Sequence, residues 1–436
     1  MEQTPSPARA RAHAAQAVLH VLEYNRTIDW ILENKPHLTG TALERELFQG
    51  TVRHCLSLTA SVEKHLQKDL RAKDTDLFCL MLVGAYQLKY SHIPAHAAVH
   101  ETVSATKPLG KPWARGLVNA ILRQVGRAPS EELDQSFDHP EWLATMLRSD
   151  YPEDWQSILS ANNTRAPMSL RINVCRTSPT DYMESLAARD IAYQAGALSE
   201  CVTLVAPRAA TGLPGWTNGH VAVQDMGAQF AAHLLHENPA AEHRSLDACA
   251  APGGKLAHLL ERTWLESQSA SLNPVVQAID ISPRRVAETQ KILQRLGHNA
   301  DLKVGDARHL DWWDGQPYTH ILLDAPCSGT GTIRRHPDIK LLLTPSALEA
   351  HADLQITLLN NLWQTLAPGG TLLYCTCSLL AAENDDVIGR FLNRNNKDTH
   401  VLDIKLPTGR KTRYGWQLLP TDPSTDGFFY ARLQKA

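Results

Sequence analysis

Five β-rich runs alternate with helical stretches over the second half of the chain, and this alternation restricts the possible folds more than any other feature. The runs are RSLDACA (244–250), VVQAIDI (275–281), ADLKVGD (300–306), HILLDAP (320–326) and GGTLLYCTCS (369–378). Strand–helix alternation is typical of a doubly wound parallel sheet, in which ligands bind at the carboxyl ends of the strands. We therefore predict a Rossmann-like α/β domain over residues 226–436.

The first part of the chain has a helical pattern instead. Between residues 8 and 128 apolar residues recur three and four positions apart, as in Ala14, Val18 and Val21, and Pro- and Gly-bearing breaks separate the runs. This spacing places the apolar side chains on one face of each helix. The pattern predicts an all-α bundle over residues 1–129.

The stretch between these two parts combines a linker and a short α+β pattern. Residues 129–145 are acidic and contain Pro, which is typical of a linker. From residue 165 onward, strand-like runs such as PMSLRINV and CVTLVA surround one helical run. We predict a linker followed by a small α+β subdomain, together spanning residues 130–225.

Composition and charge exclude several classes of protein. The 436 residues hold 43 Lys and Arg against 46 Asp and Glu, with 43 % apolar residues, which is ordinary for globular domains and excludes disorder, collagen and coiled coil. Eight cysteines are too few for a disulfide scaffold. We expect neither a signal peptide nor a membrane span. The predicted location is therefore the cytoplasm, where the cysteine thiols stay reduced. Residues 1–130 hold 16 basic and 11 acidic residues, a mild indication of nucleic-acid binding that uneven surface charge explains equally well.

A glycine-bearing loop separates the first predicted strand from the helix that follows it. Its residues are Cys249, Ala250, Ala251, Pro252, Gly253, Gly254 and Lys255. Glycines at such a turn let the backbone approach a ligand, and the helix start offers free N–H groups. The loop lacks the spacing of a dinucleotide-binding motif or a P-loop, which weakens both interpretations.

Three carboxylates end successive predicted strands. Asp280 closes the second strand, where an acid suits the hydroxyls of a ribose, Asp306 closes the third and could lie beside an adenine, and Asp324 closes the fourth. Any one of them could instead cap the following helix. The repetition at one edge of the sheet favours a nucleotide-like ligand.

Two cysteines lie at the ends of neighbouring strands. Cys327 follows the fourth strand in DAPCSG, and Cys377 ends the fifth in YCTCS. A single cysteine is most often a small buried residue, but a thiolate at the ligand-binding edge can attack a bound electrophile. Zinc is disfavoured because Cys375 and Cys377 alternate across the strand, and we assign Cys375 to packing.

These motifs together resemble one family. DACAAPGGK, DISPRRV, DAPCSGTG and YCTCS are similar to the RNA (cytosine-5)-methyltransferases of the Sun/Fmu and nucleolar group. The helical stretches GAYQLKYSHIPAHAAVHETV and GLVNAILRQVGR resemble the NusB-like domain of its bacterial small-subunit ribosomal RNA methyltransferase B branch. The resemblance implies that the helical domain over residues 1–129 binds RNA, and that an RRM-like middle subdomain and a class I methyltransferase domain follow it.

The resemblance also implies roles for particular residues. The loop 249–255 would hold S-adenosylmethionine, with Asp280 on the ribose, Asp306 and Asp324 completing the cofactor site, and no metal. Cys377 would be the nucleophile that attacks carbon 6 of cytosine, Cys327 would assist product release, and Asp324 would hold the cytosine ring, at ring nitrogen 3 if its carboxyl is protonated. The target cytosine would have to lie in a loop or be flipped out of its stack.

The implied partner is 16S ribosomal RNA, bound by a monomer without membrane contact. A basic stretch after the fourth strand supplies candidate RNA contacts, or else a solvated surface. Its residues are Arg334, Arg335, His336 and Lys340. A metal reading of His92, His96 and His100 is disfavoured because no carboxylate or cysteine completes a ligand set.

Three alternative functions stay open on the sequence. A non-catalytic RNA-binding or antitermination factor would be expected to have lost the cofactor loop or Cys377, and both are present. A cytosine-5 methyltransferase acting on transfer RNA is a second alternative. A DNA cytosine methyltransferase would carry its nucleophile at the Cys327 position.

Overall fold

The computed structural model describes residues 6–68, 70–128, 138–235, 244–269, 275–395 and 397–436, and its chain divides into two compact units. The helical unit comprises residues 1–165 and 333–343, and the sheet unit comprises residues 166–332 and 344–436. Among the described residues, no helix is both long and apolar enough to span a bilayer.

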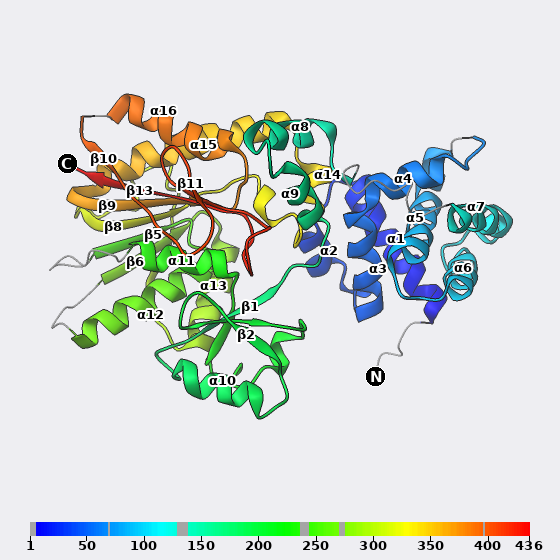
Figure 1. Cartoon of the computed structure of the whole chain (residues 1–436), viewed down its shortest axis with the longest axis horizontal. Helices are drawn as coiled ribbons and strands as arrows, with labels where there is room; N and C mark the ends of the chain where they lie inside the picture. The colour runs from blue at the N-terminus through cyan, green and yellow to red at the C-terminus, as the bar shows by residue number, and fades with distance from the viewer. Residues whose placement is uncertain (1–5, 69, 129–137, 236–243, 270–274, 396) are drawn as a thin grey trace. The chain divides into compact units, whose positions relative to one another are not determined.

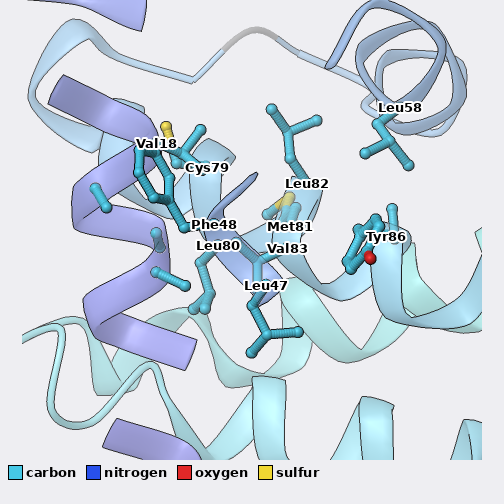
Figure 2. Close-up of a cluster of buried hydrophobic side chains, with 14 of the residues drawn as sticks. Val18, Leu47, Phe48, Leu58, Cys79, Leu80, Met81, Leu82, Val83 and Tyr86 are labelled. Carbon is cyan, nitrogen blue, oxygen red and sulfur yellow. The ribbon is translucent and has the colours of Figure 1, made fainter. Parts of the chain in front are cut away.

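The helical unit confirms the predicted all-α bundle. Its helices are α1 (Pro7–Leu22), α2 (Ile28–Asn34), α3 (Ala42–Arg53), α4 (Cys55–Glu63), α5 (Thr75–Tyr90), α6 (Ala95–Ser104), α7 (Arg115–Arg127), α8 (Glu141–Asp150), α9 (Trp155–Asn162) and α14 (Ile339–Leu342). Side chains of α1, α3, α4 and α5 form its core, with Val18, Phe48 and Leu80 fully buried (Figure 2). Helix α3 begins with the capping box Thr41 and Glu44.

The predicted linker differs from the structure in part. Residues 129–137 lie outside the described residues, but α8 already begins at Glu141 and buries Leu143 and Leu147. Two apolar residues four positions apart suffice to bury one face of a short helix, which the acidic composition of the stretch concealed.

The small subdomain of the sheet unit is an antiparallel sheet of four strands with one helix, as the α+β pattern predicted. Its strand order is β2-β3-β1-β4. Its elements are β1 (Met168–Ile172), α10 (Pro179–Ala187), β2 (Tyr193–Ala195), β3 (Cys201–Leu204) and β4 (Val221–Val223).

The rest of the sheet unit is the doubly wound domain. Its strands are β5 (Arg244–Ala248), β6 (Val275–Asp280), β7 (Asp301–Val304), β8 (Tyr318–Asp324), β9 (Leu366–Thr376), β10 (Thr399–Leu402), β11 (Arg410–Lys411), β12 (Trp416–Leu418) and β13 (Phe428–Lys435). Its helices are α11 (Met226–Leu235), α12 (Gly254–Ser269), α13 (Pro283–Leu296), α15 (Pro345–Thr365) and α16 (Asp385–Asn395). All five predicted strands are present and pair in parallel, in the order β7-β6-β5-β8-β9 (Figure 1).

Both faces of this sheet are buried. Ile321 and Leu323 of β8 pack in one core with α15 and α16, whereas Leu322 between them packs with α11 on the other face. Apolar residues at successive positions of a strand are therefore all buried, on one face of the sheet or the other, which explains the continuous apolar runs in the strand sequences. The strands β10–β13 extend the sheet beyond β9, with β13 antiparallel to β9.

Candidate active site

The predicted site residues lie at the carboxyl ends of five adjacent parallel strands. Strand β5 is followed in the chain by β6 on one side of it, and β8 pairs on its other side, so the winding direction reverses between β5 and β8. Such a reversal opens a crevice at the strand ends, where ligands of this fold class bind.

The loop from β5 to α12, residues 249–255, has a backbone that only certain residues can adopt. Cys249 and Gly253 both have positive φ, 68° and 94°. A Cβ atom on Gly253 would also lie 2.7 Å from Cγ2 of Thr289, closer than real Cβ contacts. Glycine at 253 is thus required for both reasons, and α12 starts immediately afterwards.

Contacts from β6 and α13 hold this loop in place. The N–H of Ala251 donates to Oδ2 of Asp280 at 3.1 Å, and the guanidinium of Arg285 donates to the carbonyl of Ala251. Asp280 is 3 % exposed and also accepts from the N–H of Ser282 through Oδ1. The carboxylate predicted to bind ribose therefore also fixes the loop.

Arg171, a residue that sequence reasoning missed, holds the end of loop 249–255 in place. Arg171 of β1 is fully buried, donates to the carbonyl of Gly254 at 2.7 Å and binds Glu261 of α12 through two nitrogens, at 2.8 and 3.0 Å. A bidentate Arg–carboxylate pair has a fixed geometry. The small subdomain thus positions the start of α12, a long-range contact with no local sequence signal.

A cavity of about 240 Å³ opens beside the loop. It is lined by Cys249, Asp280, Ile281, Arg285, Gly305, Asp306, Ala307, Arg308, Pro326, Leu354 and Leu358. The structure thus brings two of the predicted carboxylates, Asp280 and Asp306, to one cavity. Asp306 is bound by the Arg308 side chain, whose hydrogen bonds lower the pKa of the carboxyl.

The two predicted cysteines meet at the ends of β8 and β9. The Sγ atoms of Cys327 and Cys377 are 3.4 Å apart. The hydrogen bond with Cys377, together with burial, raises the pKa of the Cys327 thiol well above its usual value. Cys327 therefore retains its proton and can donate a hydrogen bond to the sulfur of Cys377.

Asp324 lies between a lysine and the third cysteine of this region. Nζ of Lys255 is 2.8 Å from its Oδ2, and Sγ of Cys375 is 3.4 Å from its Oδ1. Burial lowers the pKa of Lys255, but the Asp324 carboxylate opposes it and the net shift is upward. Cys375 is buried as predicted, but it also binds Asp324. Both carboxylate oxygens of Asp324 thus have a partner, Lys255 on one side and Cys375 on the other.

Asp247, the penultimate residue of β5, is a second buried acid near this ion pair. Neither of its carboxyl oxygens has a hydrogen-bond partner among the described residues. Burial, and after it the charge of Asp324, raises its pKa well above the usual range. A neutral Asp247 adds no further negative charge to the site.

A network of polar side chains holds the two cysteine-bearing loops together. Glu383 accepts from the N–H of Ser328 at 2.8 Å and from the amide of Gln355 at 3.1 Å, and the N–H of Gly331 donates to the carbonyl of Cys377 at 2.9 Å. A Cβ atom on Gly331 would lie 2.1 Å from the carbonyl oxygen of Gly427, so these backbones touch. Sequence reasoning missed Glu383 and Gln355, because neither belongs to a motif, although Glu383 follows Cys377 by only six residues.

The prediction that the basic stretch after β8 contacts RNA is wrong for Arg334 and Lys340, because both side chains are buried. Lys340 is fully buried, and its Nζ donates to the carbonyl of Arg53 at 2.6 Å and to Oδ1 of Asn163 at 2.8 Å. Arg334 is also buried, whereas Arg335 and His336 are partly exposed. Lys340 and Arg334 are therefore not available as surface contacts, because the segment packs inside the helical unit.

In the described part of the chain, one group of His, Cys, Asp or Glu side chains has the geometry to hold a metal ion, and it consists of Glu200, His233 and His258. It contains none of the histidines that the sequence suggested. Glu200 accepts hydrogen bonds from His233 at 2.5 Å and from His258 at 3.2 Å. One ring nitrogen of each histidine and one carboxylate oxygen of Glu200 lie within 4.8 Å of one another. His92, His96 and His100 form no such group there.

Comparison with family models matches each part of the chain. A model described as 16S rRNA methyltransferase RsmB/F matches residues 234–434. The ferredoxin-like domain of RsmF/B-like methyltransferases matches residues 139–211, and the NusB family matches residues 8–127. The NusB-like helical part, the ferredoxin-like middle domain and the Rossmann-like methyltransferase domain are thereby confirmed.

Similar proteins cover almost the whole chain. Ribosomal RNA small subunit methyltransferase B of Pseudomonas syringae is 43 % identical over 98 % of this chain and 96 % of its own length, and that of Vibrio cholerae is 40 % identical over 98 % and 97 %. A crystal structure of a methyltransferase homologue from Pyrococcus horikoshii is 27 % identical, with a TM-score of 0.59, over 68 % of this chain and 96 % of that one. The crystal structure of PH0851 has a TM-score of 0.81 over the full length of both chains at 21 % identity, which shows a shared fold. On its sequence identity, its domain matches and its fold, this chain belongs to the RsmB/F family of 16S ribosomal RNA methyltransferases.

Proposed function

We propose that this chain transfers a methyl group from S-adenosylmethionine to carbon 5 of a cytosine in 16S ribosomal RNA, through a covalent adduct between Cys377 and carbon 6. The observation that carries the proposal is the pair of thiols 3.4 Å apart at the ends of β8 and β9, next to Pro326 of the cavity wall. Two thiols at this distance can divide the roles of nucleophile and proton carrier.

The cavity residues fit the proposed cofactor. Asp280 and Asp306 offer carboxylate oxygens to ribose hydroxyls and to an adenine amino group, and Ile281, Ala307 and Leu358 offer apolar surface to a purine ring. Loop 249–255 would hold the methionine part, because Gly253 leaves room for close backbone approach. When bound, S-adenosylmethionine supplies the methyl group that carbon 5 accepts.

The chemistry uses the cysteines in order. The Cys377 thiolate adds to carbon 6, which moves an electron pair through the ring to carbon 5 and makes that carbon nucleophilic. After methylation, a base removes the proton from carbon 5 and the electron pair expels Cys377 as a thiolate. Cys327 assists the departure of Cys377, because its raised thiol pKa keeps it protonated and able to donate a hydrogen bond to the leaving thiolate.

Asp324 and Lys255 hold the cytosine ring. As an ionised carboxylate paired with Lys255, Asp324 can accept a hydrogen bond from the 4-amino group of cytosine. Protonation at ring nitrogen 3 would require the ion pair to open and Asp324 to take up a proton when the base enters.

Labelled S-adenosylmethionine and unmodified 16S ribosomal RNA test this proposal. Wild type should transfer label to carbon 5 of cytosine, Cys377→Ala should transfer none, and Cys327→Ala should accumulate a protein–RNA adduct that survives a denaturing gel. Cys175→Ala, a partly buried cysteine of the sheet unit remote in sequence from both motifs, is the matched control. Full activity of Cys377→Ala would overturn the proposal.

The same assay separates the alternative substrates. Transfer to unmodified transfer RNA in preference to 16S ribosomal RNA would favour the transfer RNA enzyme, and no transfer to any RNA would favour a non-catalytic binding factor. An adduct formed by Cys377→Ala and lost in Cys327→Ala would point to the DNA-type mechanism. The names of the Pseudomonas syringae and Vibrio cholerae relatives support the small-subunit substrate.

A further inference from the structure

A groove of about 680 Å³ lies between α6 and α7 of the helical unit, two helices that pack against each other and against α5 (Figure 1). Its floor is apolar and consists of Leu88 from α5, Val99 and Val103 from α6, and Leu122 from α7. The site described above uses none of these residues.

The wall formed by α7 carries a regular row of positive charge. Arg115, Asn119, Arg123 and Arg127 follow one another at intervals of four residues and all line the groove. With a rise of about 1.5 Å per residue, the interval corresponds to about 6 Å along the helix. All three arginines are exposed, and none forms an ion pair with a described residue.

The facing wall adds two histidines and no acid. His96 and His100 of α6 line the groove, and its thirteen lining residues include neither Asp nor Glu. Glu101, next along α6, is hydrogen-bonded to Nδ1 of His100 at 3.1 Å. The groove therefore has arginines on one wall and imidazole rings on the other, and no carboxylate lines it.

The uneven charge of the first 130 residues comes from this part of the chain. Residues 1–87 hold ten basic and ten acidic residues, whereas residues 88–130 hold six basic residues and one acidic residue. The whole positive excess thus lies in the stretch that builds α6 and α7. Three of these six basic residues, Arg115, Arg123 and Arg127, line the groove, and a cluster of positive charge on one wall points to an anionic ligand.

We propose that this groove binds a single-stranded segment of RNA, with its phosphates on the arginines of α7 and its bases against the apolar floor. The inference rests on the proposed function, since it assigns a contact surface to the RNA substrate. A polyanion whose charge repeats along its length matches arginines repeated along a helix, and bases have apolar faces that suit Leu88 and Val103. An acidic amphipathic peptide would direct its apolar side chains to the floor of the groove and its carboxylates away from the floor. Such a peptide therefore matches the row of arginines on α7 less well than RNA does.

The glycines of α7 keep the groove open. A Cβ atom on Gly116 would meet nothing within 4 Å, and one on Gly126 would lie 3.7 Å from Leu88, an ordinary contact. A tryptophan at 126 can therefore occupy the groove while every arginine stays in place. Gly126→Ala is its matched control, because it adds helix propensity without filling the groove.

Fluorescence anisotropy with a labelled, unstructured RNA oligonucleotide of mixed sequence tests the proposal on the full-length protein at several salt concentrations. Arg123→Gln with Arg127→Gln should raise Kd about tenfold and reduce the log–log salt slope by about 0.7 for each lost phosphate contact. Arg45→Gln with Arg394→Gln removes two exposed arginines outside the groove and should leave both unchanged. Gly126→Trp should weaken binding and Gly126→Ala should not.

Several results would overturn the assignment. These are unchanged RNA binding in the groove variants, an equal loss in the Arg45 and Arg394 control, or a groove-dependent affinity for an acidic amphipathic peptide in place of RNA. Methyl transfer is read separately: groove variants should raise KM for RNA and keep kcat. If wild type methylates no RNA, the proposed function fails while the anisotropy result still decides the groove.

Discussion

Nζ of Lys255 lies 2.8 Å from Oδ2 of Asp324, and this ion pair joins the last residue of the loop 249–255 to the last residue of β8. The side chains are 12 % and 31 % exposed. The pair thus spans the point where the sheet reverses its winding, between the proposed cofactor site and the proposed cytosine site. A ligand bound at either proposed site would therefore lie close to both side chains.

Lys255→Met should reduce methyl transfer about 10- to 100-fold. The substitution keeps most of the side-chain volume but leaves the Asp324 carboxylate without its cation, so the carboxylate loses the charged partner that holds it in position. A methyl-transfer assay with labelled S-adenosylmethionine measures the loss. Lys255→Arg, which keeps the charge with a different geometry, should retain more activity, and equal loss in both variants would argue against a role for charge.

Asp280→Asn should raise the Kd for S-adenosylmethionine about tenfold or more. The carboxylate lines the cavity and accepts from the N–H groups of Ala251 and Ser282, and an amide cannot accept through both of its terminal atoms. Isothermal titration calorimetry measures the change. Asp301→Asn, at the start of β7 and half exposed, is the control with the same change of charge and should bind like wild type.

Arg171→Met should lower the free energy of unfolding of the sheet unit by about 3–5 kcal/mol. It leaves Glu261 buried at 1 % side-chain exposure without its bidentate partner, although His298 lies 3.3 Å away. Urea denaturation of the full chain measures the loss. The double variant Arg171→Met with Glu261→Met should recover much of it, and a purely additive double variant would contradict the ion-pair explanation.

The sequence predicted the strands and their ends well because the signal is local. Asp280 and Asp324 each follow an apolar run, Asp306 follows the short strand DLKV, and parallel strands bring such ends to one edge whatever the loops between them do. The meeting of Cys327 and Cys377 follows from the same rule, since β8 and β9 are neighbours. Of the antiparallel strands, β10, β11 and β12 were missed because they have only four, two and three residues. Strand β13 has eight residues but is buried at six successive positions and lacks clear alternation.

The supporting residues could not be predicted, because their function depends on tertiary contacts. Arg171 and Glu261 are 90 positions apart, and Glu383 holds the Cys327 loop from 55 positions away. We predicted Lys340 at the surface because lysine is rarely buried without partners. In the structure its ammonium is buried and donates hydrogen bonds to the carbonyl of Arg53 and to the side chain of Asn163.

Lys340→Met should change the pH dependence of stability. Burial lowers the pKa of Lys340 to about 7, with Asp138 and Cys55 opposing and Arg53 reinforcing the shift, whereas an unfolded lysine titrates near ~10.4. Between about pH 7 and pH 10 the unfolded chain therefore binds a proton that the folded chain does not, and wild-type stability gains about 1.4 kcal/mol per pH unit from this group. Methionine removes that gain.

Relative to wild type, Lys340→Met should accordingly be most favoured at pH 7 and lose its advantage steadily toward pH 10. Urea denaturation of both proteins across this range measures the difference, in which the titrations of all other groups cancel. Lys107→Met removes an exposed lysine of the same unit and should show no such trend. A constant difference between wild type and Lys340→Met would mean that Lys340 stays charged in the folded protein, held by the two oxygens that its Nζ contacts and by the carboxylate of Asp138.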